Sequence, residues 1–195
     1  MPVCLNAQAN RRARMHRFRL SAIKTLSLLL RDKYVGGHAA EALGKIGPDA
    51  WDAVPFLLDA LKRDEARVRV ESARALGLIK AGQKAVTPLK AALADFNPEV
   101  RAAAGLAHFR ISGEAETALA ALIPDLHLPA ISPSGSMPAA TPATADALGL
   151  MGAAARPAVP ALLRAIWHEN YDIHRAAVDA LKKVDPEAAR NAGFP

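Results

Sequence analysis

The chain has 195 residues, of which 51% are apolar and only 5% aromatic, and it carries a net charge of +6 at pH 7. Its single cysteine, Cys4, excludes an internal disulfide and a multi-cysteine metal site. Since no stretch approaches the roughly 18–20 apolar residues that span a bilayer and the first residues lack a secretory pattern, we expect a cytoplasmic protein without a membrane span.

The first 24 residues hold six basic side chains and no acidic one, whereas the remaining chain has 19 of each sign. We interpret residues 1–21 as a basic arm or an atypical first helix. Such a segment is either simply solvated, or it steers the chain to nucleic acid, an anionic membrane surface or an acidic partner. Only His16 and Phe18 are present there for base stacking, so nucleic-acid binding is the weaker alternative. The electrostatic candidates are Arg11, Arg12, Arg14, Arg17 and Arg19.

From Tyr34 onwards one pattern is repeated five times. Each copy has an apolar stripe ending in an Ala-Leu-Gly-like signal, a Gly or Pro break, and a second stripe spaced Leu-x-x-x-Leu. Corresponding positions recur at intervals of 33, 32, 40 and 33 residues, at Leu43, Leu76, His108, Leu148 and Leu181. These intervals are typical of stacked helix pairs. We therefore predict an all-α protein: a right-handed α-solenoid of about five stacked antiparallel helix pairs over residues 22–184, followed by a carboxy-terminal tail over 185–195.

Helix ends are indicated by local capping signals. Left-handed C-terminal turns, which favour a residue without a side chain, are expected at Gly47, Gly113 and Gly152. Helix starts are expected where a capping side chain precedes proline, at Asn97-Pro98, Thr141-Pro142 and Asp185-Pro186.

The second stripes align one leucine of each copy in a predicted core column, at Leu57, Leu89, Leu122 and Leu162. An earlier copy over residues 22–30 has its expected partner helix near 5–17, where the stripe dissolves into Arg-rich sequence, so we expect an incomplete first repeat. Pro124 falls inside one of these stripes and is expected to kink that helix or end it early. Trp51 is expected in a helix-joining turn, packed over the repeat edge.

The single 40-residue interval is explained by an insertion, PAISPSGSMPAATP, at residues 129–142. Four prolines, three serines and a glycine cannot continue a helix, so we predict an inserted Pro/Ser-rich loop over 129–141. It is either a tolerated surface loop, or a segment that covers a groove, docks a partner or is modified at Ser132, Ser134 or Ser136.

The whole pattern resembles HEAT-like repeats of the bacterial type first described in phycobilisome lyases. The resemblance covers about 22–184. The residues that carry it are the Val-Arg pairs at 68–69 and 100–101, the Ala-Leu-Gly signals at 42–44, 75–77 and 147–149, and the Ala-Val-Pro openings at 53–55 and 158–160. It implies an armadillo-like superhelix with the first helix of each pair on the convex side and the second on the concave side.

The resemblance also implies a ladder in which the Val-Arg arginine interlocks with an aspartate of the inter-repeat loop. The pairs expected here are Asp64 with Arg69 and Asp95 with Arg101. Three repeats have Gly36, Thr141 and His174 at the arginine position, so the ladder is expected to be interrupted there.

Enzymes of the resembled family give alternatives. HEAT-like deoxyhypusine hydroxylases hold a di-iron centre with His-Glu pairs just after the Val-Arg position. None of the corresponding pairs is His-Glu here, and the His168-Glu169 dipeptide falls at the end of a second helix. We therefore expect no catalytic residue, metal or cofactor, and interpret His38 as a flanking helix residue. The bilin-lyase branch has no motif to test, so it stays open.

What remains is binding. We expect a non-catalytic scaffold or adaptor that holds a protein partner, not a small-molecule substrate, along the concave surface. The alternatives are an accessory or enzyme subunit of the oxidoreductase or lyase branch, and weak nucleic-acid binding, although the concave charges nearly balance. Trp167 is either the exposed anchor of this surface or a core cap packed on Tyr171 and Ile173. The candidate contact residues are Lys62, Arg63, Lys90, His127, Arg164, Trp167 and His168.

Overall fold

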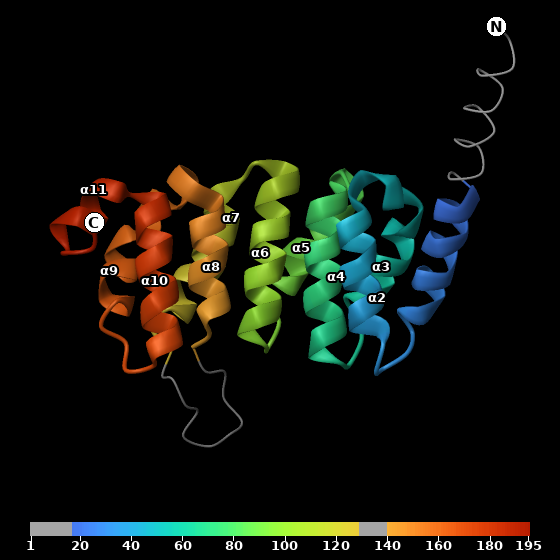
Figure 1. Ribbon diagram of the computed structural model, residues 1–195, viewed down its shortest axis with the longest axis horizontal. Coiled ribbons are helices and arrows are strands. Elements are labelled where there is room, and N and C mark those ends of the chain that lie inside the picture. The colour runs from blue at the N-terminus through green and yellow to red at the C-terminus, as the bar shows by residue number, and fades with distance from the viewer. Residues whose placement is uncertain (1–16, 129–139) are drawn as a thin grey trace, which may run out of the picture.

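The computed structural model describes residues 17–128 and 140–195. Within these ranges the chain forms helices and no strands, arranged as a row of antiparallel pairs (Figure 1). The predicted all-α helical repeat is therefore confirmed. Three sequence predictions fall outside the described residues: the helix expected near 5–17, the arginines at 11, 12 and 14, and the serines of the inserted loop.

The first helices of the pairs stand side by side in one layer (Figure 1). They are α2 (Gly36–Ile46), α4 (Ala66–Ile79), α6 (Pro98–Ser112), α8 (Pro142–Met151) and α10 (Tyr171–Val184). The second helices are a segment over 17–29, α3 (Val54–Ala60), α5 (Gln83–Ala92), α7 (Ala115–Asp125) and α9 (Val159–Ala165). Two short 3₁₀ helices, η1 (Gly47–Ala53) and η2 (Gly152–Ala158), join members of a pair, and α11 (Pro186–Asn191) ends the chain.

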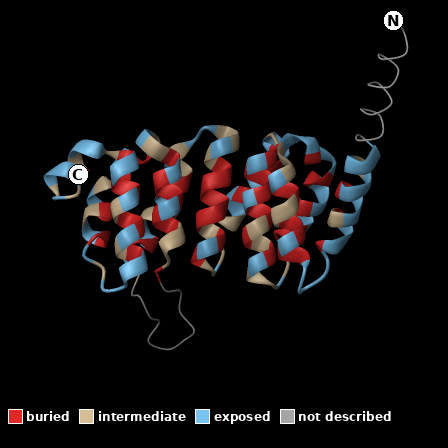
Figure 2. Cartoon of the chain, viewed as in Figure 1, coloured by how far each residue is buried: buried red, intermediate tan, exposed pale blue. Residues whose placement is uncertain are grey.

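The core lies between the two layers, where the predicted columns meet. The repeat positions aligned with Leu43 in the first helices, including His108, and with Leu57 in α3, α5, α7 and α9 are fully buried, whereas Leu26, at the same position of the segment over 17–29, is partly buried. Burying such leucines is the main stabilising contribution of each repeat, worth about 1.5–3 kcal/mol per side chain. Figure 2 shows the buried residues on the facing sides of the helices and exposed ones over most of residues 17–29 and α11.

Glycine brings neighbouring first helices close together. A Cβ on Gly77 of α4 would lie 2.9 Å from the Cα of Ala107 in α6, and Gly44 and Gly149 meet the next first helix in the same way. In α6 the corresponding residue is Phe109. The core is accordingly divided into two buried clusters that meet in α6, one reaching back to residue 23 and the other forward to residue 189.

The predicted helix ends are confirmed in position, with differences in form. Gly113 adopts the left-handed conformation, whereas Gly47 and Gly152 combine positive φ with extended ψ and lead directly into η1 and η2. Asn97 and Asp185 cap their helices as predicted, by accepting backbone N–H groups. Thr141 does not: its hydroxyl forms no cap bond and is buried without a partner among the described residues.

Two further local predictions have clear outcomes. Pro124 does not end α7 early, because α7 ends at Asp125, the repeat position at which α3, α5 and α9 also end. The proline lies in the last turn, where it removes one backbone hydrogen bond without shortening the helix. Trp51 lies in η1 as predicted, and its half-exposed ring rests on Gly82, the residue before α5.

Candidate partner-binding surface

Two arginines at equivalent positions of α4 and α6 join successive repeats. Arg69 Nε and Nη2 donate to both carboxylate oxygens of Asp95 at 2.7 and 3.0 Å, and Arg101 binds Asp125 in the same bidentate way at 2.8 and 2.6 Å. Each Nη1 donates to two backbone carbonyls of the loop that precedes its own helix, those of residues 63 and 64 or 95 and 96. Each arginine side chain therefore joins the loop that precedes its own helix to an aspartate at or just after the end of the following second helix.

The predicted pairing of these arginines is wrong by one repeat. The aspartates at 64 and 95 present their carbonyls, not their carboxylates, to Arg69 and Arg101. The Asp95 carboxylate is already engaged, because it accepts from Arg69 and from the backbone N–H of Asn97. The planar guanidinium has enough donors to contact its own loop with one nitrogen and the next repeat with two.

The position of Asp95 between these donors sets its protonation. Burial acts to raise the pKa of Asp95, but hydrogen bonds from the Arg69 guanidinium and the Asn97 N–H, with the positive charges of Arg69 and Arg101, outweigh burial and hold the pKa below its usual range. Asp95 is therefore negatively charged and bound to Arg69, and it also lines a pocket between α3 and α5.

The ladder changes at the three predicted positions. Gly36 has no side chain, and Thr141 forms no ion pair. His174 keeps only the contact to its own loop, through a short hydrogen bond between Nδ1 and the Ile166 carbonyl. Its ring stacks on Tyr171 at a centroid distance of 6.2 Å and meets the edge of Phe194 at 6.0 Å.

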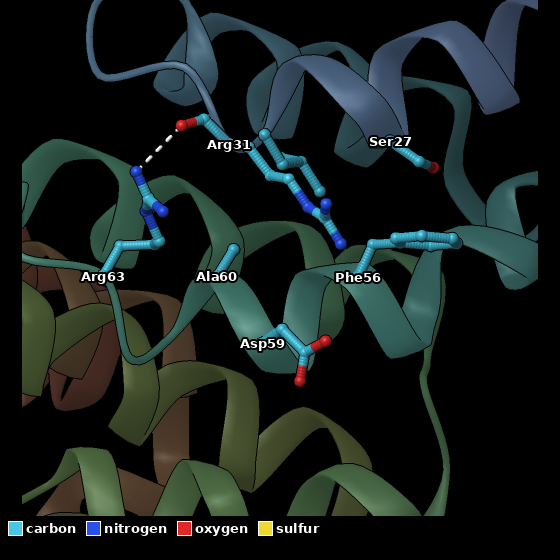
Figure 3. Close-up of a pocket in the computed structure, with 7 residues that line it drawn as sticks. Ser27, Arg31, Phe56, Asp59, Ala60 and Arg63 are labelled. Carbon is cyan, nitrogen blue, oxygen red and sulfur yellow. Dashed lines mark hydrogen bonds between the residues drawn. The ribbon is translucent and has the colours of Figure 1, made fainter.

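The second helices enclose two pockets that are related by the repeat. The first, about 430 Å³, lies between the helix over 17–29 and α3 (Figure 3). The second, about 250 Å³, lies between α3 and α5. Their linings occupy the same repeat positions. The first is lined by Ser27, Leu30, Arg31, Phe56, Asp59, Ala60 and Arg63. The second is lined by Leu58, Leu61, Lys62, Pro88, Ala91, Ala92, Ala94 and Asp95.

Figure 3 shows how the charged residues lie in the first pocket. The Arg31 side chain extends over it towards Phe56 and Asp59. Arg63 Nη2 donates to the Arg31 carbonyl at 2.8 Å, and Arg63 Nε lies 3.6 Å from the Glu65 carboxylate. Arg63 therefore helps to hold the loop, whereas Arg31 is an exposed residue.

The structure places the predicted contact residues in three groups along the second helices. Lys62 and Arg63 line the two pockets, and Lys90 is exposed on α5. The third group is at the other end: Arg164 Nη2 lies 2.9 Å from His127 Nε2, His168 Nδ1 accepts from the Asn170 N–H at 3.1 Å, and Trp167 follows Arg164 by one turn.

Trp167 does not cover the core. It is 80% exposed, and Tyr171 is 71% exposed beside it. The alternative in which Trp167 packs on Tyr171 and Ile173 is therefore not what the structure shows, and its contact role stays a prediction.

Sequence reasoning missed Arg31 and Phe56. Arg31 follows Leu30 just as Lys62 follows Leu61 and His127 follows Leu126, so extending that column by one copy would have found it. Phe56 stands where Pro88, Ala121 and Ala161 stand in later repeats, so the repeat pattern shows an apolar position but does not indicate an exposed aromatic ring there. Of the predicted amino-terminal cations, Arg17 is exposed and Arg19 is paired with Asp49.

The described residues contain no group of three or more His, Cys, Asp or Glu side chains placed to hold a metal ion. Within the same ranges, none of the helices combines the length and apolar character that crossing a membrane requires.

Comparisons with known proteins agree with this geometry. The family model described as HEAT repeats matches residues 19–107. A chain in the structure of the complex of CpcE and CpcF of phycocyanin lyase from Nostoc sp. PCC7120 is 27% identical, with 88% of this chain and 67% of that chain covered and a TM-score of 0.62. Two engineered proteins are 22% and 21% identical, with 88% of this chain and 85% and 86% of theirs covered and TM-scores of 0.48 and 0.49. Comparison with curated proteins found no match.

Proposed function

We propose, from the premise that this chain is a HEAT-like repeat protein, that it is a non-catalytic scaffold which binds a protein partner along the surface of its second helices. The observation that carries the proposal is the pair of repeat-related pockets between the helix over 17–29, α3 and α5. Two pockets that lie one repeat apart fit two side chains of an extended or helical segment of another protein.

Two further observations support the same proposal. The similar Nostoc chain comes from a complex of two proteins, so partner binding is a property of a chain with this fold. Trp167 is also exposed, one turn after Arg164, and tryptophan and arginine are among the residues that most often dominate binding energy at protein interfaces.

The similarity to a phycocyanin lyase chain favours a second candidate, an accessory subunit of an enzyme complex. In that case the partner supplies the chemistry and this chain supplies the surface. The two candidates differ in the identity of the partner, which is an enzyme only under the second.

The test is affinity capture from native lysate with the intact chain and two variants of it. Ala91→Arg fills the second pocket. Ala153→Arg places the same side chain at an exposed position of η2, away from the pockets. We expect a partner to be recovered with the wild type and Ala153→Arg and lost with Ala91→Arg, while all three unfold at the same temperature. Equal recovery with all three chains would contradict the proposed surface.

A further inference from the structure

The two pockets between the helix over 17–29, α3 and α5 together form what we call the second-helix groove. Its positive and negative side chains do not balance once the ion pairs within the fold are taken into account. The charged side chains that line the two pockets are Arg31, Asp59, Lys62, Arg63 and Asp95. By type, these are three cations and two anions, and one of the cations, Arg63, is paired with Glu65 at 3.6 Å. Asp95, however, is neutralised by the bidentate contact with Arg69, which comes from the other layer.

An aspartate carboxylate is neutralised in the same way one repeat further on. Asp125, at the end of α7, is buried, and its two carboxylate oxygens accept hydrogen bonds from Nε and Nη2 of Arg101. The exposed cations of this face, Lys90 on α5 and Arg164 on α9, therefore meet no carboxylate from either aspartate. Among the described lining residues of the two pockets, Asp59 is the acid that no arginine neutralises.

The floor of the groove is apolar. Between α3 and α5 it consists of Leu58, Pro88 and alanines, and in the first pocket Phe56 is partly exposed beside Arg31. Small apolar side chains flanked by cations match a ligand that presents aliphatic groups on one side and carboxylates at its edges. A polynucleotide, by contrast, needs a continuous cationic track with stacking rings, and this floor consists mostly of alanine and leucine side chains.

We infer that the partner segment is an acidic amphipathic stretch of protein, whose carboxylates pair with Arg31, Lys62 and Lys90 while its apolar side chains enter the two pockets. This inference rests on the proposed function and adds to it the chemistry of the partner. Asp59 fixes the register, because a carboxylate placed next to it is repelled, whereas one placed next to Lys62 in the second pocket is attracted.

The test uses fluorescence anisotropy with the full chain and three synthetic 18-residue peptides. One has glutamate and leucine at helical spacing, and two have glutamine or lysine in place of every glutamate. An 18-nucleotide single-stranded DNA is the fourth probe. We expect the glutamate peptide to bind at least about tenfold more tightly than the other two peptides and the DNA, with affinity falling as salt rises.

Two double variants with the same change of charge locate the binding. Arg31→Glu with Lys62→Glu reverses the groove, and Arg110→Glu with Lys182→Glu reverses exposed cations on the first helices α6 and α10. The first is expected to weaken glutamate-peptide binding at least about tenfold, and the second less than about threefold. Equal losses in both would overturn the inference, because they would show attraction to net charge alone.

The remaining outcomes separate this inference from the proposed function. If the glutamine peptide binds as tightly as the glutamate peptide and Ala91→Arg abolishes both, the groove binds protein but the acidic partner is wrong. If DNA binds more tightly than any peptide and depends on Arg31 and Lys62, both the inference and the proposed protein partner are wrong. Absence of binding by the glutamate peptide also overturns the inference, and lysate capture then decides the proposed function independently.

Discussion

At the scale of single residues, Arg69 and Arg101 do two jobs. Their bidentate contacts with Asp95 and Asp125 join successive repeats, and the same contacts neutralise two negative charges at the ends of the second helices. The Arg101–Asp125 pair is the more buried, with 11% and 8% of the side chains exposed, and the Arg69–Asp95 pair has 16% and 14%. At such burial a broken pair leaves a charge without its partner, which costs far more than losing a surface pair.

Asp95→Asn should expose the stabilising role of this ladder through its pH dependence. The folded pKa of Asp95 is lowered, so its contribution to the free energy of unfolding is present above the unfolded pKa of about 3.9 and is lost as pH falls through the lower, folded value. We expect the variant to be about 2 kcal/mol less stable than the wild type at pH 7, with the difference shrinking below about pH 4. Urea unfolding at pH 7, 4 and 3 measures it. Asp59→Asn is the control, and a difference that stays constant with pH would contradict the pairing.

Trp167→Ala should leave the fold unchanged. Because the side chain is 80% exposed, its truncation is expected to alter the free energy of unfolding by no more than about 0.5 kcal/mol. Thermal unfolding checks this, with Leu162→Ala as a buried reference on α9, the helix that precedes the Trp167 turn; this variant should lose about 2–5 kcal/mol. If Trp167→Ala lost as much free energy of unfolding as Leu162→Ala, the tryptophan would have to be part of the core, which would contradict the exposed position.

At the scale of helices, the first-helix layer is held by glycine and alanine at one recurring position. The Ala-Leu-Gly signal, read from sequence as a family marker, proves to be a packing device: each glycine faces an alanine of the next first helix. Where Phe109 replaces it, the two buried clusters of the core meet. The contact between α6 and α8 therefore differs from its neighbours in chemistry, and the inserted loop joins α7 to α8 at this same repeat.

Gly77→Ala tests the packing role by the sign of its effect. In the middle of an ordinary helix this change stabilises by about 0.5–1 kcal/mol. Here the new methyl would lie 2.9 Å from the backbone of Ala107, so we expect a loss of about 1–3 kcal/mol in urea unfolding. Gly37→Ala is the control, because its methyl would meet only the flexible, exposed side chain of Arg67, which contacts His38 Nε2 at 3.0 Å, and no backbone of the next helix. A gain of stability for Gly77→Ala would show that α4 and α6 tolerate a wider spacing.

At the scale of the whole molecule, the row of pairs and its core followed from periodicity, because each repeat buries the same columns against its neighbours. Leu43 and Leu57 illustrate this: both were placed by alignment alone, and both are fully buried. Capping was predictable where one side chain decides it, as at Asn97. It failed at Thr141, where proline alone marks the start of the helix, and it missed Asn170, which caps α10 without a following proline.

The candidate surface was less accessible to sequence reasoning. Counted from the sequence, the charges of the predicted concave face nearly balance, because a sequence does not show which carboxylates form ion pairs inside the fold. By sequence Asp95 is an acid of the second-helix surface, but in the structure its carboxylate is bound by Arg69, which lies 26 residues earlier and in the other layer. The pockets were hidden for a related reason, since they form between helices of successive repeats and depend on packing distances rather than on any motif.

The central claim is that the second-helix surface receives the partner. Hydrogen exchange of the chain, alone and with the partner recovered by affinity capture, tests it most directly, because the method reports protection along every helix at once. We predict that binding slows exchange in α3 and α5 and at the end of α9, and leaves α2, α4 and α6 unchanged in their exposed turns. Protection confined to the first helices, or spread equally over both layers, would contradict the proposed surface.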